Sequence, residues 1–164
     1  MILDTHDKAI LQILQIDGRA SASYISDKIG LSVPAVSERM RKMQDLGIIK
    51  GYQAVIDTKK IGCDVSAFIT IVSESSAHFN DVIENAEKTE EVIKCYTTTG
   101  SGSHILYVVT KNTSSLESLL RVIQSWPGVT RTITNLVLSS YKDFNNIPLD
   151  VEKEQLFNKI HKER

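Results

Sequence analysis

The chain has 164 residues, 41% of them hydrophobic, which suits one large or two small soluble globular domains. Its formal net charge of −1 argues against a protein that coats nucleic acid without regard to sequence. The first residues carry charges where a secretory signal needs an apolar core, and no apolar stretch approaches the ~20 residues of a membrane span. We therefore expect a cytoplasmic protein with no membrane partner.

The charges are unevenly distributed along the chain. Residues 1–60 hold nine Lys and Arg against seven Asp and Glu, a net +2, and the remainder carries −3. Residues 37–60 alone hold six basic against three acidic side chains, a local +3. This bias suits a nucleic-acid interface, and a solvated helix face would explain it equally well.

Three short helical patterns follow one another in residues 1–50. The first begins after Asp4, a good N-cap, and stops at Asp17-Gly18. The second begins after Ser21 and ends at Gly30, which suits the left-handed residue at a helix C-terminus. The third begins after Ser32 and ends at Leu46-Gly47, with a proline in its first turn, where a missing N–H is harmless.

The second and third helices, joined by a tight turn that contains glycine, are typical of a helix-turn-helix. If Val36, Met40 and Met43 face the core, an advance of about 100° per residue turns the polar side chains outward. Arginine offers two parallel hydrogen bonds to a guanine edge or a phosphate, and lysine a salt-sensitive phosphate contact. The residues predicted to contact double-stranded DNA are Ser32, Pro34, Ser37, Glu38, Arg39 on the flank, Arg41, Lys42 and Lys50.

Residues 48–56 have the β-branched content of a strand, and Lys50 precedes Gly51 as it would in a DNA-contacting wing. A plain linker strand with a chance lysine is an equally good interpretation. Residues 57–64 are polar and contain a glycine, which favours a domain boundary there. We assign residues 1–50 to the helix-turn-helix domain and residues 51–64 to a linker or wing strand.

From residue 65 the pattern becomes strand, helix, strand, strand, helix, strand. The expected ranges are 65–72, 76–88, 91–98, 103–110, 114–125 and 130–141. The two halves repeat with an offset of 37 residues, so that Ile69 aligns with Leu106 and Phe79 with Leu116. Each helix offers one apolar stripe to the same face of an antiparallel sheet. We predict a ferredoxin-like βαββαβ sandwich over residues 65–142, and an α+β fold class for the chain.

The other face of this predicted sheet also carries apolar residues, for example Ile105, Tyr107 and Val109. A soluble protein rarely leaves such a face in water, so we expect a second subunit to cover it. Residues 143–148 read as a turn-rich linker, and an amphipathic helix is possible from Asp150 within a C-terminal extension over 143–164.

The segment from Thr99 to His104 is the loop with the greatest backbone freedom, because two glycines allow close approach. No helix start follows it, which excludes a phosphate loop. A ligand site and a mobile hairpin without a ligand both remain open.

Residues suited to catalysis or metal binding do not cluster. The four histidines stand in different segments without the i, i+4 spacing of a metal site, and no Ser or Cys lies in a nucleophile elbow. Cys63 and Cys95 lie in apolar runs outside any Cys-x-x-Cys pair, so we expect buried thiols. We predict no catalytic residues, no metal site and no cofactor.

Several of these runs together resemble the Lrp/AsnC family of leucine-responsive, or feast/famine, transcription regulators. The resemblance covers residues 2 to about 142. It is carried by Leu14 to Asp17-Gly18-Arg19, Ile29-Gly30-Leu31-Ser32, Val36 with Arg39, and Leu46-Gly47-Ile48-Ile49 followed by Gly51-Tyr52.

The resemblance implies that the third helix is the recognition helix and that dimers bind pseudo-palindromic DNA, often gathering into octamers. It also implies that the second domain is a RAM domain, named for regulation of amino-acid metabolism, which pairs by its sheet face. An amino-acid effector would bind between dimers near the glycine-containing loop. The residues this implies are Thr98, Gly100, Ser101, Gly102, Ser103, His104, Thr132 and Thr134.

The loop departs from the family pattern at two positions. Relatives commonly have Gly-Asp-x-Asp where this chain has Gly100-Ser101-Gly102-Ser103. A carboxylate is a natural partner for the ammonium group of an amino acid, so serine hydroxyls would have to serve as neutral partners.

An enzyme is the alternative function, because siroheme decarboxylases resemble the same family and have lost DNA binding. Such an enzyme has no need of an outward basic recognition helix, whereas Arg39, Arg41 and Lys42 are present here. We therefore predict a DNA-binding regulator and not an enzyme.

Overall fold

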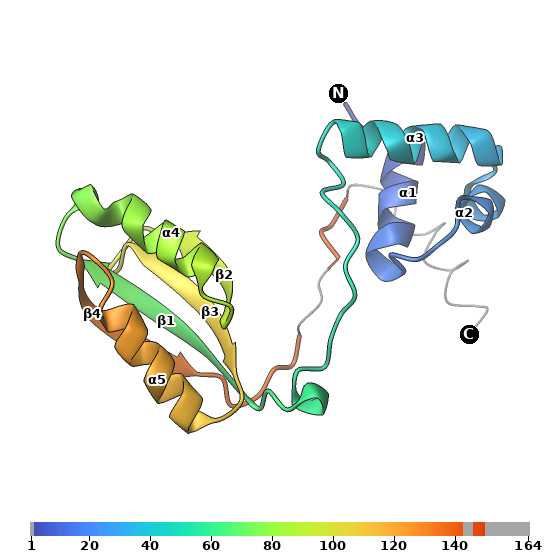
Figure 1. The fold of residues 1–164 in the computed structure, drawn as a ribbon. Coiled ribbons are helices and arrows are strands. Elements are labelled where there is room, and N and C mark those ends of the chain that lie inside the picture. The colour runs from blue at the N-terminus through green and yellow to red at the C-terminus, as the bar shows by residue number, and fades with distance from the viewer. Residues whose placement is uncertain (1, 143–145, 150–164) are drawn as a thin grey trace. The chain divides into compact units, whose positions relative to one another are not determined.

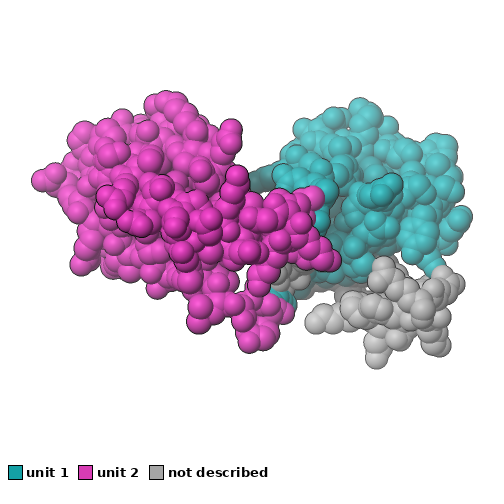
Figure 2. Space-filling view, turned by 60° about the horizontal axis from the view of Figure 1, so that its bottom comes forward, with its two compact units in different colours: residues 1–55, 142–164 teal, residues 56–141 magenta. Residues whose placement is uncertain are grey.

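The computed structural model describes residues 2–142 and 146–149. Two compact units are present: unit 1 comprises residues 1–55 with the segment from residue 142 onward, and unit 2 comprises residues 56–141 (Figures 1 and 2). The division between residues 55 and 56 falls inside the predicted linker over 51–64. The helix expected from Asp150 lies outside the described residues.

Local capping signals determine where the helices of unit 1 begin. Among the described residues this unit contains three helices: α1 (Thr5–Ile16), α2 (Ala22–Ile29) and α3 (Val33–Asp45). The predicted N-caps are confirmed, because Asp4, Ser21 and Ser32 each accept a hydrogen bond from a backbone amide in the following first turn. Gly30 ends α2 at φ 74°, a left-handed conformation that favours glycine.

One apolar core holds the three helices together. Its fully enclosed side chains are Ile10, Ile13, Ile25, Val36 and Met43. Ile147 also contacts this unit: the side-chain oxygen of Gln15 accepts from the Ile147 amide at 2.5 Å, and the side-chain nitrogen of Gln15 donates to the Ile147 carbonyl at 3.4 Å. Unit 1 is therefore built from two stretches of chain.

The strand expected over residues 48–56 does not form, and that prediction was wrong. The amides of Ile48 and Ile49 instead donate to the carbonyl of Met43 at 2.9 and 3.1 Å, as part of the C-terminal cap of α3. A strand needs a partner for its backbone groups, and no described segment pairs with this one. Lys50 consequently lies in irregular backbone, with no paired wing in the described chain.

Unit 2 has the predicted βαββαβ order. A short turn of 3₁₀ helix, η1 (Lys59–Ile61), precedes β1 (Val65–Ser73), and a second, η2 (Ser76–His78), leads into α4 (Phe79–Lys88). The remaining elements are β2 (Val92–Thr97), β3 (His104–Thr110), α5 (Thr113–Gln124) and β4 (Val129–Leu136). All pairings are antiparallel in the order β2-β3-β1-β4, which confirms the ferredoxin-like sandwich.

The last strand ends at Leu136, five residues before the predicted end at 141. Leu136 pairs with Ala67, and the Val137 amide donates to Ser66 at 2.9 Å. Since β1 begins at Val65, the chain beyond this point has almost no neighbour left to pair with.

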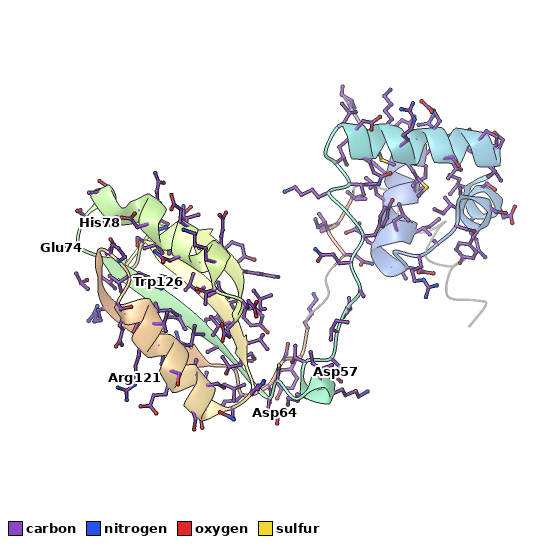
Figure 3. All side chains as sticks on the ribbon, viewed as in Figure 1. Asp57, Asp64, Glu74, His78, Arg121 and Trp126 are labelled. Carbon is purple, nitrogen blue, oxygen red and sulfur yellow. The ribbon has the colours of Figure 1, made fainter. Side chains whose placement is uncertain are left out.

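Helices α4 and α5 cover the same face of the sheet (Figure 1). The two central strands place Ile69 directly opposite Leu106, and both are fully buried beneath the helices, as the internal repeat predicts. Trp126, which follows α5, points into this core and is 6% exposed (Figure 3). No helix in the described chain is both long and apolar enough to span a bilayer.

Candidate functional site

The outward face of α3 presents polar side chains that the core does not use. Val36 and Met43 are fully buried, and the helical advance between them turns the opposite side of α3 to solvent. Ser37, Glu38, Arg41 and Lys42 are all exposed there. Ser32 and Pro34 are exposed at the start of the helix, where the Ser32 hydroxyl accepts from the Ala35 amide at 3.4 Å.

Arg41 is held within its own helix by two acids. Its Nη2 donates to Glu38 Oε1 at 2.6 Å, its Nε to Glu38 Oε2 at 3.2 Å, and its Nη1 to Asp45 Oδ2 at 3.1 Å. The hydrogen bonds from Arg41 lower the pKa of Glu38. All three side chains are more than 60% exposed, at 64%, 63% and 62%. Ion pairs this exposed are weak, so a phosphate or a base edge can compete for the guanidinium.

Arg39 lies differently, although it is only two residues away on the same helix. Its Nη1 donates to Asp4 Oδ2 and to Asp7 Oδ1, both at 2.7 Å. The hydrogen bond to Asp7, followed by that to Asp4, raises the pKa of the guanidinium. The Asp7 amide, followed by Arg39, lowers the pKa of Asp4.

Sequence reasoning identified Asp4 as a cap and did not identify Asp7 as a partner of Arg39. The available signal was the Asp4-x-x-Asp7 spacing of a capping box, whose reciprocal hydrogen bonds the structure contains. Whether Arg39 contacts DNA stays a prediction.

The loop between β2 and β3 is a tightly anchored hairpin. The Thr98 hydroxyl donates to the Gly102 carbonyl at 3.3 Å, and the Thr98 amide donates to the Ser103 carbonyl at 3.0 Å. The Ser103 amide donates to the Ile71 carbonyl of β1 at 2.8 Å. Gly100 has φ 110°, so it needs the conformational freedom of glycine.

Gly102 allows the loop to lie directly on β1. A Cβ atom at this position would come within 2.3 Å of Thr70 Cγ2 and 2.8 Å of the Ile71 carbonyl oxygen. Any side chain here would displace the strand, so an acid can be introduced into the loop at the exposed Ser101 and not at Gly102.

His104 lies beneath the loop and not on its surface. Its ring is fully buried and lies 4.3 Å from the ring of Phe79, centroid to centroid. Its Nδ1 is 2.9 Å from the Ser103 hydroxyl, and its buried Nε2 has no hydrogen-bond partner among the described residues. Burial lowers the pKa of His104.

Thr132 and Thr134 are not gathered with the loop hydroxyls. They lie on β4, where they pair with Ile71 and Ile69, two residues that point toward the helices. Because β1 separates β4 from β3, Thr132 lies about 10 Å from His104 across the sheet. Its hydroxyl is also within 3.2 Å of the amide nitrogen of Gln124 on α5.

Thr98, Gly102, Ser103 and His104 form one hydrogen-bonded cluster, from which both β4 threonines are separate. No group of three or more His, Cys, Asp or Glu side chains that could hold a metal ion occurs in the part of the chain that the structure describes.

Two family profiles match the two units. A profile described as the Lrp/AsnC ligand-binding domain matches residues 66–147, and one described as a winged helix-turn-helix DNA-binding domain matches residues 3–50. A similar curated protein is the HTH-type transcriptional regulator FL11 of Pyrococcus horikoshii. It is 37% identical over 147 residues, which cover 90% of this chain and 97% of FL11.

Solved structures of similar proteins include two complexes with L-methionine. The transcriptional regulator NMB0573 from Neisseria meningitidis is 26% identical with a TM-score of 0.85, covering 91% of this chain and 98% of its own. The feast or famine regulatory protein Rv3291c from Mycobacterium tuberculosis is 34% identical with a TM-score of 0.84, covering 90% of this chain and all of its own.

Proposed function

Because the chain belongs to the Lrp/AsnC family of transcription regulators, we propose that it binds pseudo-palindromic DNA as dimers or larger oligomers and responds to an amino acid. Its curated relatives are transcription regulators and not enzymes. We also propose that it acts in the cytoplasm.

The observation that carries the DNA-binding proposal is the outward face of α3. This helix packs on the core through Val36 and Met43, which leaves its opposite face available to a major groove. Arg41 and Lys42 are the exposed cations on that face. Arg41 would exchange its weak pairs with Glu38 and Asp45 for DNA, and Lys42 would neutralise a phosphate.

A mobility-shift titration on the DNA upstream of the protein's own gene tests this proposal. We expect Arg41→Ala to weaken binding roughly tenfold or more. Lys42→Ala should make the fall of log affinity with log salt concentration less steep by about 0.9, the value for one lost phosphate contact. The matched control is Arg121→Ala, because Arg121 on α5 is also an exposed arginine paired within its helix, to Glu117 at 2.6 Å (Figure 3).

Wild-type affinity in both α3 variants, or an equal loss in Arg121→Ala, would contradict DNA binding through α3. An absence of any retardation by the wild-type protein at low salt would contradict the proposed function as a whole.

For the effector we propose the loop from Thr98 to Ser103, which offers hydroxyl groups and backbone amides. Two structural relatives are complexes with L-methionine, which supports an amino acid as the ligand class. Ser101 is exposed at the tip, so its hydroxyl is available to a ligand without disturbing the anchored part of the loop.

A thermal-shift screen against the amino acids tests the effector proposal, since a ligand of the folded state raises the melting temperature. We expect at least one amino acid to raise it, and Ser101→Ala to reduce the rise. Ser118→Ala on α5 is the control, because its hydroxyl is also exposed and bonds only within its helix, to Ser114. No rise with any amino acid, or an unchanged rise in Ser101→Ala, would contradict this site.

For the assembly we propose dimers joined through the uncovered face of the sheet in unit 2, with octamers as the larger form. The apolar side chains on that face include Phe68, whose ring lies 5.1 Å from that of Tyr107.

A further inference from the structure

A cluster of one arginine and two aspartates joins two helices that are distant in sequence. Arg39 stands in the middle of α3, and Asp4 and Asp7 stand at the start of α1, 35 and 32 residues away. The single atom Nη1 of Arg39 donates to both carboxylates at 2.7 Å. It is a contact between elements, unlike the pairs of Arg41, which stay within α3.

Each of the two aspartates uses one carboxylate oxygen to cap α1 and the other to bind Arg39. Asp4 Oδ1 accepts from the Asp7 amide at 2.8 Å, and Asp7 Oδ2 accepts from the Asp4 amide at 3.2 Å, which closes the capping box. The remaining oxygens, Asp4 Oδ2 and Asp7 Oδ1, both bind Arg39. The arginine therefore completes the cap of α1 and attaches it to α3.

The burial of Asp7 makes it unfavourable for Arg39 to leave the aspartates and bind DNA instead. The Asp7 side chain is 3% exposed and that of Arg39 is 32% exposed. A buried carboxylate is strongly destabilising unless a cation accompanies it. If Arg39 turned to a DNA phosphate, Asp7 would remain buried without its counter-charge, and this penalty opposes the exchange.

The position of Arg39 on its helix agrees with an inward role. It follows Val36 by three residues and precedes Met43 by four, and both of those side chains are fully buried. Positions at these spacings share one face of a helix, so Arg39 belongs to the stripe that faces α1.

We propose that Arg39 is a positioning residue for DNA binding: it fixes α3 to the capped start of α1 and contacts no phosphate or base. This inference rests on the proposed function of α3 as the recognition helix. It assigns opposite roles to two arginines that stand two residues apart, with Arg39 facing the protein and Arg41 facing the DNA.

Salt-dependent DNA binding by Arg39→Gln and Arg41→Gln separates the two roles. Log affinity falls with log salt, and each phosphate contact that is lost makes this negative slope less steep by about 0.9. We expect Arg39→Gln to weaken binding about tenfold at every salt concentration with an unchanged slope. Arg41→Gln should lower affinity together with the steepness of this slope or the preference among sequences.

Asp7→Asn gives a second, independent readout. Removing a negative charge near DNA strengthens binding if the charge only repels phosphates. A positioning role predicts the reverse, a loss of several-fold, because Arg39 loses its buried partner. The double variant Arg39→Gln/Asp7→Asn should bind no more weakly than Arg39→Gln alone, since both substitutions break the same contact.

Circular dichroism and the melting temperature identify variants that fail to fold. If Arg39→Gln does not fold, Arg39→Lys replaces it. Because lysine keeps the positive charge, Arg39→Lys should retain more of the wild-type affinity than Arg39→Gln. A less steep slope for Arg39→Gln, tighter binding by Asp7→Asn, or additive losses in the double variant would overturn the positioning role while leaving DNA binding intact. Absence of DNA binding by the wild-type protein would instead overturn the proposed function.

Discussion

His104 places an imidazole in a part of the core that is otherwise apolar. Leu106 and Val108, the next residues on the same face of β3, are equally buried. The histidine satisfies Nδ1 through Ser103, but its Nε2 is without a partner among the described residues. A buried polar atom without a hydrogen-bond partner lowers the free energy of unfolding by about 1–3 kcal/mol. The site therefore favours the neutral ring, and burial lowers the pKa of His104.

We predict that His104→Leu flattens the acid dependence of stability. As the pH falls below about 6.5, the unfolded histidine binds a proton that the folded one resists, so the wild-type protein loses stability. Above that pH the histidine is neutral in both the folded and the unfolded protein, so its lowered pKa does not change the stability. Leucine removes this dependence and the unpaired nitrogen, so its free energy of unfolding at about pH 7.5 should be equal to or about 1 kcal/mol above wild type.

Urea unfolding at about pH 7.5 and pH 5, at one fixed protein concentration, measures both effects. His6→Gln is the control, because it also removes one histidine, and His6 is exposed at the start of α1. An equal loss of stability on acidification in His104→Leu and wild type would contradict a role for the buried ring.

At the scale of elements, the sequence predicted the helices of unit 1 well because their ends are specified locally. Asp4, Ser21 and Ser32 each cap the helix that directly follows them, and Gly30 ends α2 without help from distant residues. In unit 2 the 37-residue repeat was equally informative, since it aligned Ile69 with Leu106 and the two face each other in the core.

Two strand predictions were wrong, because the extent of a strand depends on distant partners. Residues 48–56 have β-branched side chains, yet a strand forms only beside another, and here Ile48 and Ile49 cap α3 instead. The end of β4 is set by where β1 begins, which the composition of residues 137–141 does not reveal.

The same holds for the candidate site: features that depend on neighbouring residues were predictable from the sequence, and contacts between distant residues were not. Helical phase alone predicted that Arg41 points outward, and it does. The partners of Arg39 required the packing of α1 on α3, and a capping-box spacing indicates only half of that contact. The burial of His104 was available from the alternation along β3, because Leu106 and Val108 share its face.

At the scale of the whole molecule, the uncovered face of the sheet in unit 2 is the feature that bears on assembly. Phe68, Tyr96 and Ile133 come from three different strands and are 43%, 50% and 38% exposed. Phe68 lies between the buried residues Ala67 and Ile69. Ile133 and Tyr96 pair with Thr70 and Ile105, which also stand between buried residues, so all three side chains point away from the face that α4 and α5 cover. An apolar face of this kind is typical of a subunit interface.

We predict that Phe68→Glu converts the assembly to monomers, because two copies of the charge would be buried opposite each other in a two-fold interface. Light scattering after size-exclusion chromatography measures the mass. The control is Val122→Glu, since Val122 is an apolar side chain on α5 with a similar exposure of 50%. A Phe68→Glu protein with the wild-type mass would place the subunit contact elsewhere.

The same variant links assembly to DNA recognition. Two-fold dimers of helix-turn-helix proteins read half-sites about 10 bp apart, one on each copy of the recognition helix. A monomer contacts only one half-site, so Phe68→Glu should lower affinity for a full site to that for a single half-site. Inserting about 5 bp between the half-sites should weaken wild-type binding and leave Phe68→Glu binding unchanged, because only a joined pair of recognition helices is sensitive to their spacing. Equal sensitivity of both proteins to the insertion would show that unit 2 does not couple the two recognition helices through this face.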